Sequence, residues 1–324
     1  MEPLAGAPAR FGCRCDASSV EPAALLDAIH RRGFVVVDVG DLTGPELSVT
    51  FNTLLPTLEV APIGWFDHQA GVFGAKTLNL ETVGGEQFVA MGNVIDDATG
   101  APLADYVPAV TDGVRMEDHS DGSWTPALEA CLQEWHSDKR LCGFMEWHTD
   151  QLFVPVCPSV TALYCKRSGG ASTAFASGVA GLRDLPPELH RQAVDAVCQY
   201  ADTDTGHRYQ QTDYDKVTGS APIAGVQHRV TQRHPHTGEL SLRFGGLGGL
   251  DTIVGMPPLD GQRIAWQIMR HATRTENAYF HRWKEGELIV WDQRLCFHSR
   301  VPYEPDACNP REVWRVSFMP DEVR

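Results

Sequence analysis

The 324-residue sequence lacks several features that would place it in common structural classes. Its nine cysteines include no C-x-x-C pair. Neither a zinc knuckle nor a disulfide framework is therefore expected, and the odd number of thiols suits a reducing compartment. Basic residues are scarce, because 27 Lys and Arg against 42 Asp and Glu give a formal net charge of -15. Nucleic acids and anionic membranes bind to basic faces, so both are excluded as partners.

Long apolar runs are also missing. The most apolar strand-like run, from Phe34 to Val39, is short and interrupted by Asp38, so nothing is expected to span a bilayer. The first residues carry neither a basic n-region nor an apolar h-region, and we therefore expect a cytoplasmic protein. No repeat or interdomain linker is visible, and a chain of this length suits one large domain. We expect a single domain over residues 1–324.

The first part of the chain has the signals of an α/β segment. Ser18 and Glu21 have capping-box spacing, and the apolar stripe that follows predicts a helix from Pro22 to Gly33. The run Phe34-Val35-Val36-Val37 reads as a buried strand. Thr43 and Glu46 repeat the capping signal before a second helix. We expect residues 1–125 to wrap the core and to contribute to a substrate pocket.

The metal-binding jelly-roll core is expected over residues 126–324. It begins with a helical pattern from Ala127 to Trp135, and strands dominate from the Trp147-His148-Thr149-Asp150 stretch onward. Helical patterns interrupt them twice, at 187–197 and 259–271, and the polar, aperiodic residues 201–224 predict a lid-like insert. Many short strands with turn residues between them favour a mostly β fold with flanking helices, either a sandwich or a jelly-roll barrel. Strands are expected at 147–153, 160–166, 172–177, 226–232, 240–244, 277–283, 287–292 and 313–318.

Three residues have the chemistry of a metal site. His148 and Asp150 are two positions apart, so on an extended strand their side chains leave from the same face. His298 lies far downstream and is followed by two arginines. Two histidines and one carboxylate form the triad that holds non-haem Fe(II) and leaves coordination positions free. A lone His-x-Asp is common by chance, so the prediction of an iron-dependent oxygenase depends on His298 and those arginines.

Five segments, taken in order, resemble the taurine dioxygenase-like (TauD/TfdA) family of Fe(II)/2-oxoglutarate-dependent oxygenases. They cover roughly the C-terminal half of the chain. The resemblance implies a double-stranded β-helix, which is a jelly-roll or cupin-like core. It also implies that His148, Asp150 and His298 are the iron ligands and that O2 and 2-oxoglutarate are co-substrates. The segments are Trp147–Phe153, Gly169–Gly178, His234–Gly238, Gly286–Arg294 with His298, and Arg311–Arg315.

The resemblance assigns the 2-oxoglutarate site to three further residues. Arg311 matches the arginine that binds the distal carboxylate, for which a guanidinium offers a planar bidentate fork. Thr173 matches a threonine that hydrogen-bonds the same carboxylate, although the Gly-Gly-Ala-Ser-Thr run has one extra residue and leaves Ser172 as the alternative. Arg315 lies four positions after Arg311, on the same strand face. It matches an arginine that faces either the substrate's anionic group or the iron-bound end of 2-oxoglutarate.

Two residues are weaker candidates for the substrate pocket. Phe153 matches an aromatic position that lines it, and ordinary core packing is nearly as good an explanation. Arg243 adds a second cation to the pocket if it faces inward, whereas an outward Arg243 is a surface residue. His234 and His236 have no carboxylate at a matching distance in the sequence and are not expected to bind metal. Asp292 is expected to brace the strand before His298.

These residues predict a dioxygenase that hydroxylates an aliphatic C–H bond of a small, anionic substrate and releases succinate and CO2. Desaturation, cyclisation, epoxidation and oxidative cleavage need the same ligands and stay open, but Asp150 argues against a halogenase. A non-catalytic metal-binding jelly-roll sensor is the alternative of another class. A zinc hydrolase would have no use for Arg311. The family's dimers and tetramers make a homo-oligomer possible.

Overall fold

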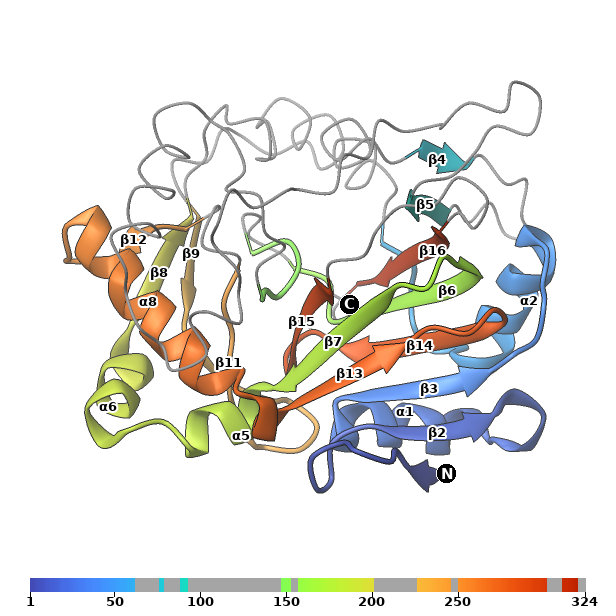
Figure 1. Cartoon of the computed structure of the whole chain (residues 1–324), viewed down its shortest axis with the longest axis horizontal. Coiled ribbons are helices and arrows are strands. Elements are labelled where there is room, and N and C mark those ends of the chain that lie inside the picture. The colour runs from blue at the N-terminus through green and yellow to red at the C-terminus, as the bar shows by residue number, and fades with distance from the viewer. Residues whose placement is uncertain are drawn as a thin grey trace.

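Two β-sheets face each other at the centre of the molecule (Figure 1). The computed structural model describes residues 1–61, 76–78, 88–92, 147–152, 157–200, 226–245, 250–301 and 311–319. All described pairings within the two sheets are antiparallel except β2–β3, which is parallel. The large sheet has the order β1 (Glu2–Pro3), β2 (Cys13–Asp16), β3 (Phe34–Asp38), β14 (Glu287–Asp292), β6 (Val160–Ser168), β16 (Arg311–Phe318), β5 (Phe88–Gly92), β4 (Lys76–Leu78), and the small sheet the order β13 (Ala278–Arg282), β7 (Ser172–Ser177), β15 (Cys296–Val301).

Side-chain alternation along the strands puts a separate apolar layer on each face of the large sheet. On β6, Leu163 and Cys165 point between the sheets and pack in one cluster with Phe175 of β7. Ala162 and Tyr164 point to the opposite face and belong to another cluster. Because both faces of β6 are covered, its first six residues are all buried.

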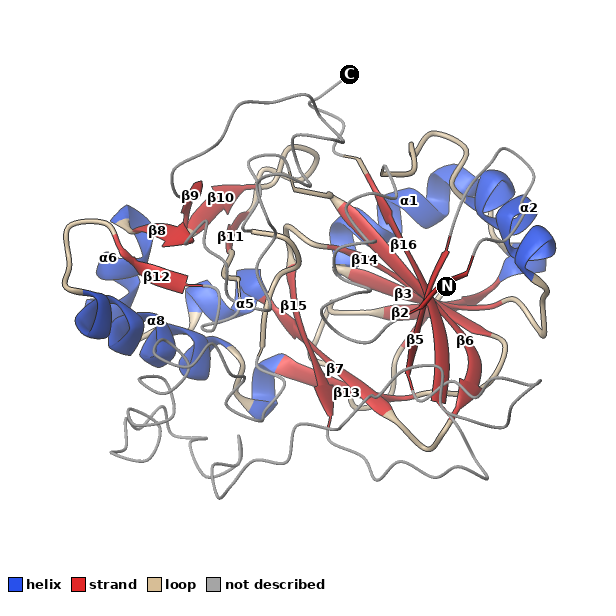
Figure 2. Cartoon of the chain, turned by 90° about the horizontal axis from the view of Figure 1, so that it is seen from above, coloured by secondary structure: helices blue, strands red, loops and turns tan. Residues whose placement is uncertain are grey.

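Helices α1 (Pro22–Arg32) and α2 (Gly44–Leu54) cover the face of the large sheet that is turned away from the small one (Figure 2). Both helices are confirmed predictions. Helix α1 ends at Gly33, which adopts a φ of 81° and donates its N–H to the carbonyl of Ile29. Helix α2 begins with the predicted capping box of Thr43 and Glu46.

The capping box predicted for Ser18 and Glu21 is wrong. Glu21 precedes α1 but makes no side-chain cap bond. Ser18 lies in a 3₁₀ turn, η1 (Ala17–Ser19), where both its N–H and its hydroxyl donate to Asp16 Oδ1, at 2.8 and 2.6 Å. Asp16 therefore accepts from the Ser18 N–H, which the predicted capping box assigned to the Glu21 side chain, and from the Ser18 hydroxyl as well.

A second group of elements packs on the outer face of the small sheet, on the left of Figure 1. Its apolar cluster includes Trp266 of α8 (Pro258–Ala272) together with Ala174, Ala176 and Phe297 of the small sheet. The elements are α5 (Gly178–Arg183), α6 (Pro187–Asp195), β8 (Val197–Tyr200), β9 (Val226–Arg229), β10 (Thr231–Arg233), β11 (Leu240–Leu242), β12 (Leu250–Ile253), α8 and η4 (Thr275–Asn277).

The mostly β fold with flanking helices is confirmed, and α6, α8 and most of the predicted strands lie close to their expected positions. The strand predicted at 147–153 is wrong over residues 147–152, which the structure describes. His148 forms an isolated bridge with His298, and residues 150–152 form a turn. Strand β15, which carries His298, was not predicted. The lid-like insert at 201–224 and most of 60–125 fall outside the described residues. No helix within the described ranges is long and apolar enough to cross a membrane.

Candidate metal centre and active site

The predicted metal ligands come from two segments that pair with each other. His298 lies on β15, and the backbone of His148 pairs with it through two hydrogen bonds, His148 N–H to the His298 carbonyl at 3.0 Å and the reverse at 2.9 Å. Such a pair places the two side chains next to each other. The ring centroids of the two imidazoles are 4.2 Å apart.

Asp150 joins the two histidines through a turn rather than an extended strand. Gln151, the next residue, has a φ of 58°, in the left-handed region that side chains other than glycine seldom adopt. The turn is held by a backbone bond of 2.6 Å from the Thr149 N–H to the Phe244 carbonyl. Asp150 Oδ1 lies 3.3 Å from His148 Nε2 and 3.5 Å from His298 Nε2.

One ligand atom from each of these three residues lies within 4.8 Å of the other two. Two imidazole nitrogens and one carboxylate oxygen are the donor set that suits non-haem Fe(II). The structure thus brings together the three residues predicted as ligands, and the chemistry of their donors fits that ion.

Charge around the centre keeps the donors in the forms that bind metal. Burial alone would raise the pKa of Asp150, but the Arg315 guanidinium and the two imidazoles hold it well below its usual value. Burial is also the main cause that lowers the pKa of His298 to about 3, against the opposing effect of Asp150. At neutral pH the carboxylate is ionised and the His298 ring is neutral, as metal binding requires.

The second oxygen of Asp150 has other partners. Arg315 Nη2 donates to Oδ2 at 2.7 Å, and Gln293 Nε2 donates to the same atom at 2.8 Å. The Asp150 N–H in turn donates to Gln293 Oε1 at 3.1 Å. Sequence reasoning missed Gln293, because it lies 143 positions from Asp150 and no local pattern connects the two residues.

The residues assigned to 2-oxoglutarate border the interior between the sheets. Arg311 lies at the start of β16 and is 4% exposed, close enough to Cys165 to influence the pKa of that thiol. Thr173 on β7 is 3% exposed, and its hydroxyl accepts a bond of 2.9 Å from Trp283 Nε1. Cys165 and Trp283 belong to the same apolar cluster, so Arg311 and Thr173 face the same layer. Their roles toward 2-oxoglutarate stay predictions.

A glycine turn between β6 of the large sheet and β7 of the small sheet lies against the backbone of Arg311. Gly169 connects β6 to β7 with a φ of 54°, and a Cβ at this position would lie 2.7 Å from the Arg311 backbone nitrogen. Only glycine therefore fits here, for both its φ and its space. Gly169 thus allows the start of β16 to approach closely, in addition to forming the turn between β6 and β7.

Of the two weaker candidates, only Arg243 lies within the described residues. Arg243 follows β11, and its Nη1 donates to Gln232 Oε1 at 2.8 Å. Its charge also acts on Cys157. No bond to the three predicted ligands is found for it among the described residues, so its substrate-binding role stays a prediction. Phe153 falls outside the described residues. Ser172 is the first residue of β7, one position before Thr173.

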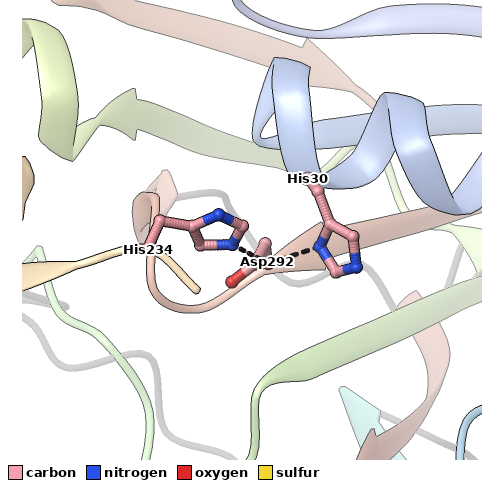
Figure 3. Close-up of side chains that lie close together, drawn as sticks. All are labelled: His30, His234 and Asp292. Atoms are coloured by element: carbon pink, nitrogen blue, oxygen red, sulfur yellow. Dashed lines mark hydrogen bonds and ion pairs between the residues drawn. The ribbon is translucent and has the colours of Figure 1, made fainter. Parts of the chain in front are cut away.

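A second group of two histidines and one carboxylate is fully buried beside this centre (Figure 3). His30 from α1 and His234 from the turn after β10 both point at Asp292, at the end of β14. His30 Nδ1 lies 2.8 Å and His234 Nε2 2.9 Å from Asp292 Oδ2. The expected bracing by Asp292 agrees with these bonds. Asp292 reaches His234 across 58 positions, a contact that the local spacing around His234 did not indicate.

This second group is a hydrogen-bonded brace rather than a metal site. The Thr237 N–H donates to His234 Nδ1 at 3.2 Å, so His234 Nε2 carries the proton that it shares with Asp292. Arg294 donates to both oxygens of Asp292, at 2.9 and 2.8 Å. Burial would raise the pKa of Asp292, but chiefly Arg294 holds it well below its usual value. A protonated nitrogen is a poor metal ligand, and here Arg294 occupies both oxygens of Asp292. Asp150 differs, because its Oδ1 faces the two imidazoles while only Oδ2 is bonded to Arg315.

Comparisons with known proteins were made by sequence and by structure. A family model described as "Taurine catabolism dioxygenase TauD, TfdA family" matches residues 78–317. An alpha-ketoglutarate-dependent sulfate ester dioxygenase of Pseudomonas putida is 26% identical over 308 residues, which are 91% of this chain and 93% of that protein. An (S)-phenoxypropionate/alpha-ketoglutarate-dioxygenase of Delftia acidovorans is 25% identical over 301 residues, covering 86% and 92%.

Solved structures of the same fold are also found. The structure of AAD-2 in complex with Mn(II) and N-oxalylglycine has a TM-score of 0.62 at 20% identity and covers 97% of each chain. A taurine dioxygenase from Burkholderia xenovorans has a TM-score of 0.61 at 17% identity, covering 99% of this chain and 89% of its own. At these identities the likeness establishes the fold.

Proposed function

This chain belongs to the taurine catabolism dioxygenase (TauD/TfdA) family, and we propose that it oxidises an aliphatic C–H bond of a small anionic substrate at the centre formed by His148, Asp150 and His298. It is an Fe(II)- and 2-oxoglutarate-dependent dioxygenase, as its relatives are. The observation that carries the proposed site is the convergence of the three donor atoms within 4.8 Å of one another.

Each side chain of the centre has a distinct task in this proposal. His148, Asp150 and His298 would hold the iron, leaving positions for 2-oxoglutarate and dioxygen. When bound, the iron supplies the dioxygen activation that couples oxidation of the substrate to release of succinate and CO2 from 2-oxoglutarate. Asp150 brings one negative charge and the neutral imidazoles bring none, so a divalent ion keeps net positive charge and attracts anions.

Two arginines on one strand supply the remaining positive charge. Arg311 would hold the distal carboxylate of 2-oxoglutarate, with Thr173 donating to the same group. Arg315 is bonded to Asp150 in a buried pair, and its charge lies beside the centre where the keto acid and the substrate react. Because charges interact more strongly away from water, both guanidiniums favour anionic ligands in this interior.

The substrate class is inferred from this charge and from the relatives. A sulfate ester and a phenoxypropionate are both anions with aliphatic C–H bonds, and they name the activities of the two relatives above. We propose hydroxylation as the default outcome. The cysteines among the described residues are free thiols, which agrees with a cytoplasmic location. We treat residues 1–324 as one oxygenase domain, because β3 near the N-terminus pairs with β14 near the other end.

A substrate screen tests the function. The protein is supplied with Fe(II), 2-oxoglutarate and O2, together with alkyl sulfates, phenoxyalkanoates or alkyl sulfonates. Succinate release is measured and the product is weighed by mass spectrometry. A gain of one oxygen indicates hydroxylation, and a loss of two hydrogens indicates desaturation or cyclisation. Uncharged analogues of the best substrate are expected to react far more slowly. Equal rates for charged and uncharged analogues would refute the anionic class.

The metal centre is tested without a substrate. Anaerobic addition of Fe(II) and 2-oxoglutarate should produce a weak visible charge-transfer band, which His298→Ala should lose. Arg183→Ala, an exposed change on α5, is the control and should keep the band. A parent protein that binds Fe(II) but gives neither the band nor succinate would instead support the non-catalytic sensor.

A further inference from the structure

The two carboxylate oxygens of Asp150 lie in different environments. Oδ1 faces the imidazole nitrogens of His148 and His298, at 3.3 and 3.5 Å. Oδ2 points away from this pair and accepts two hydrogen bonds, from Gln293 Nε2 at 2.8 Å and from Arg315 Nη2 at 2.7 Å. One oxygen is thus presented to the metal position, and the other is held by protein donors.

Gln293 is itself held in one orientation. Its Nε2 donates to Thr161 Oγ1 at 2.7 Å as well as to Asp150, and its Oε1 accepts the Asp150 backbone N–H. These three bonds use both hydrogens of the amide and one lone pair of its oxygen, so the amide cannot rotate without losing partners. Thr161 Oγ1 then lies 3.0 Å from Ser317 Oγ, which continues the network into β16. All these side chains are buried.

The turn that carries Gln293 is anchored on its other side. The neighbouring Asp292 is the centre of the brace in Figure 3, where His30 and His234 point at its carboxylate. The backbone N–H groups of Asp292 and Gln293 donate to Gly33 and Ser159, each at 2.8 Å. Side chains and backbone from four parts of the chain therefore determine where the Gln293 amide lies.

From this arrangement we propose that Gln293 is a positioning residue that makes Asp150 bind the iron through a single oxygen. The inference rests on the proposed function and goes beyond it. A carboxylate that bound through both oxygens would occupy a coordination position needed by 2-oxoglutarate or dioxygen. With Oδ2 engaged by Gln293 and Arg315, only Oδ1 is offered. A neutral amide does this without adding charge, whereas a second carboxylate at position 293 would repel Asp150.

The experiment compares metal affinities of matched variants. Gln293→Met keeps the length of the side chain but removes its donor and acceptor. Gln262→Met makes the same change at another fully buried glutamine, which lies on α8 and donates to the Leu250 carbonyl. Binding of Mn(II) is followed through the electron paramagnetic resonance signal of the free ion, and thermal unfolding is recorded for each variant. His298→Ala shows whether the parent binds the ion at the proposed centre.

Loss of the partner that orients a metal ligand costs about 10- to 100-fold in metal affinity. We expect a change of that size in Gln293→Met, parent-like affinity in Gln262→Met, and similar melting temperatures for the two. In Gln293→Met with Fe(II), the band that 2-oxoglutarate induces should weaken, and more succinate should form per oxidised product. Parent-like Mn(II) affinity in Gln293→Met, or an equal loss in Gln262→Met, would overturn the inference.

A second variant decides the matter if Gln293→Met does not fold. Thr161→Val removes the hydroxyl that orients the Gln293 amide, with almost no change in volume, and should weaken Mn(II) binding to a smaller extent. Unchanged affinity in Thr161→Val would then overturn the inference. If the parent protein and His298→Ala bind Mn(II) with equal affinity, the proposed metal centre itself is refuted. This outcome is distinct from a failure of the inference about Gln293.

Discussion

Glu287 provides a quantitative test of how charged side chains stabilise β14, the strand that leads to Asp292 and Gln293. This residue begins β14 and is 2% exposed. Its Oε1 accepts from Arg14 Nη2 at 2.6 Å, and its Oε2 lies 3.0 Å from His281 Nε2 and 2.9 Å from the Lys284 N–H. Burial would raise the pKa of Glu287, but these partners lower it to about 2.

The shift converts to stability through proton linkage. From 4.5 in the unfolded chain to about 2 in the folded one, the pKa change corresponds to about 3 kcal/mol at pH 7. Because the folded pKa is the lower one, this contribution is complete above pH 4.5 and is lost as the pH falls toward 2. By the same relation it is about 2 kcal/mol at pH 3.5.

Glu287→Gln should therefore lower the free energy of unfolding by about 3 kcal/mol at pH 7, or the melting temperature by about 5 °C. Urea unfolding followed by tryptophan fluorescence measures this difference, which should shrink as the pH is lowered. Glu59→Gln, at an exposed position, is the control and should change stability by less than about 0.5 kcal/mol. A difference between Glu287→Gln and the parent that stays constant from pH 7 to pH 3.5 would refute the linkage.

Three further predictions concern the site. Arg311→Ala should raise the dissociation constant of 2-oxoglutarate by about 10- to 100-fold, because hydrogen bonds to a charged group contribute that much to affinity. Arg311→Lys should have an intermediate effect. Isothermal titration calorimetry with Mn(II) present measures the constant, and a parent-like value for Arg311→Ala would contradict the prediction. Gly169→Ala should weaken both stability and 2-oxoglutarate binding, because the added methyl group strains a positive φ and presses on the Arg311 backbone. Gly170→Ala is the control, since Gly170 has the same sign of φ but open space around it, and it should cost only about 1 kcal/mol of stability. Equal effects of the two variants in denaturant titrations would count against the contact with Arg311. Asp292→Asn should lower the free energy of unfolding by about 3 to 5 kcal/mol, because the buried Arg294 would lose the carboxylate charge to which it donates two bonds. A loss of under about 1 kcal/mol by chemical denaturation would show that the brace is dispensable.

Local patterns predicted the elements that local interactions determine. Thr43 and Glu46 bond to each other across three residues, so their spacing alone predicted the start of α2. The same spacing misled at Ser18, because Asp16, two residues before it, accepts both its donors. Helix signals are therefore sound where no closer side chain competes for the same N–H groups.

The parts of the site that sequence reasoning missed depend on distant contacts. Strand β15 has the sequence Cys-Phe-His-Ser-Arg-Val, with no run of apolar residues to mark it as a buried strand. Gln293 meets Asp150 across 143 positions, and His30 meets Asp292 across 262. Patterns within a window cannot predict such pairs. His148, Asp150 and His298 were predictable because their residue types carry the chemistry, although the turn that joins the first two was not.

The order of strands in the large sheet has a consequence for how the chain matures. Strand β3, made early, pairs with β14, which follows about 250 residues later, and β14 leads directly to Gln293 and His298. During synthesis one edge of β3 therefore stays unpaired until β14 has left the ribosome. Contacts between residues so far apart in the sequence form slowly. The three predicted iron ligands therefore come together only after β15 has been made, and a product that stops before β14 lacks His298.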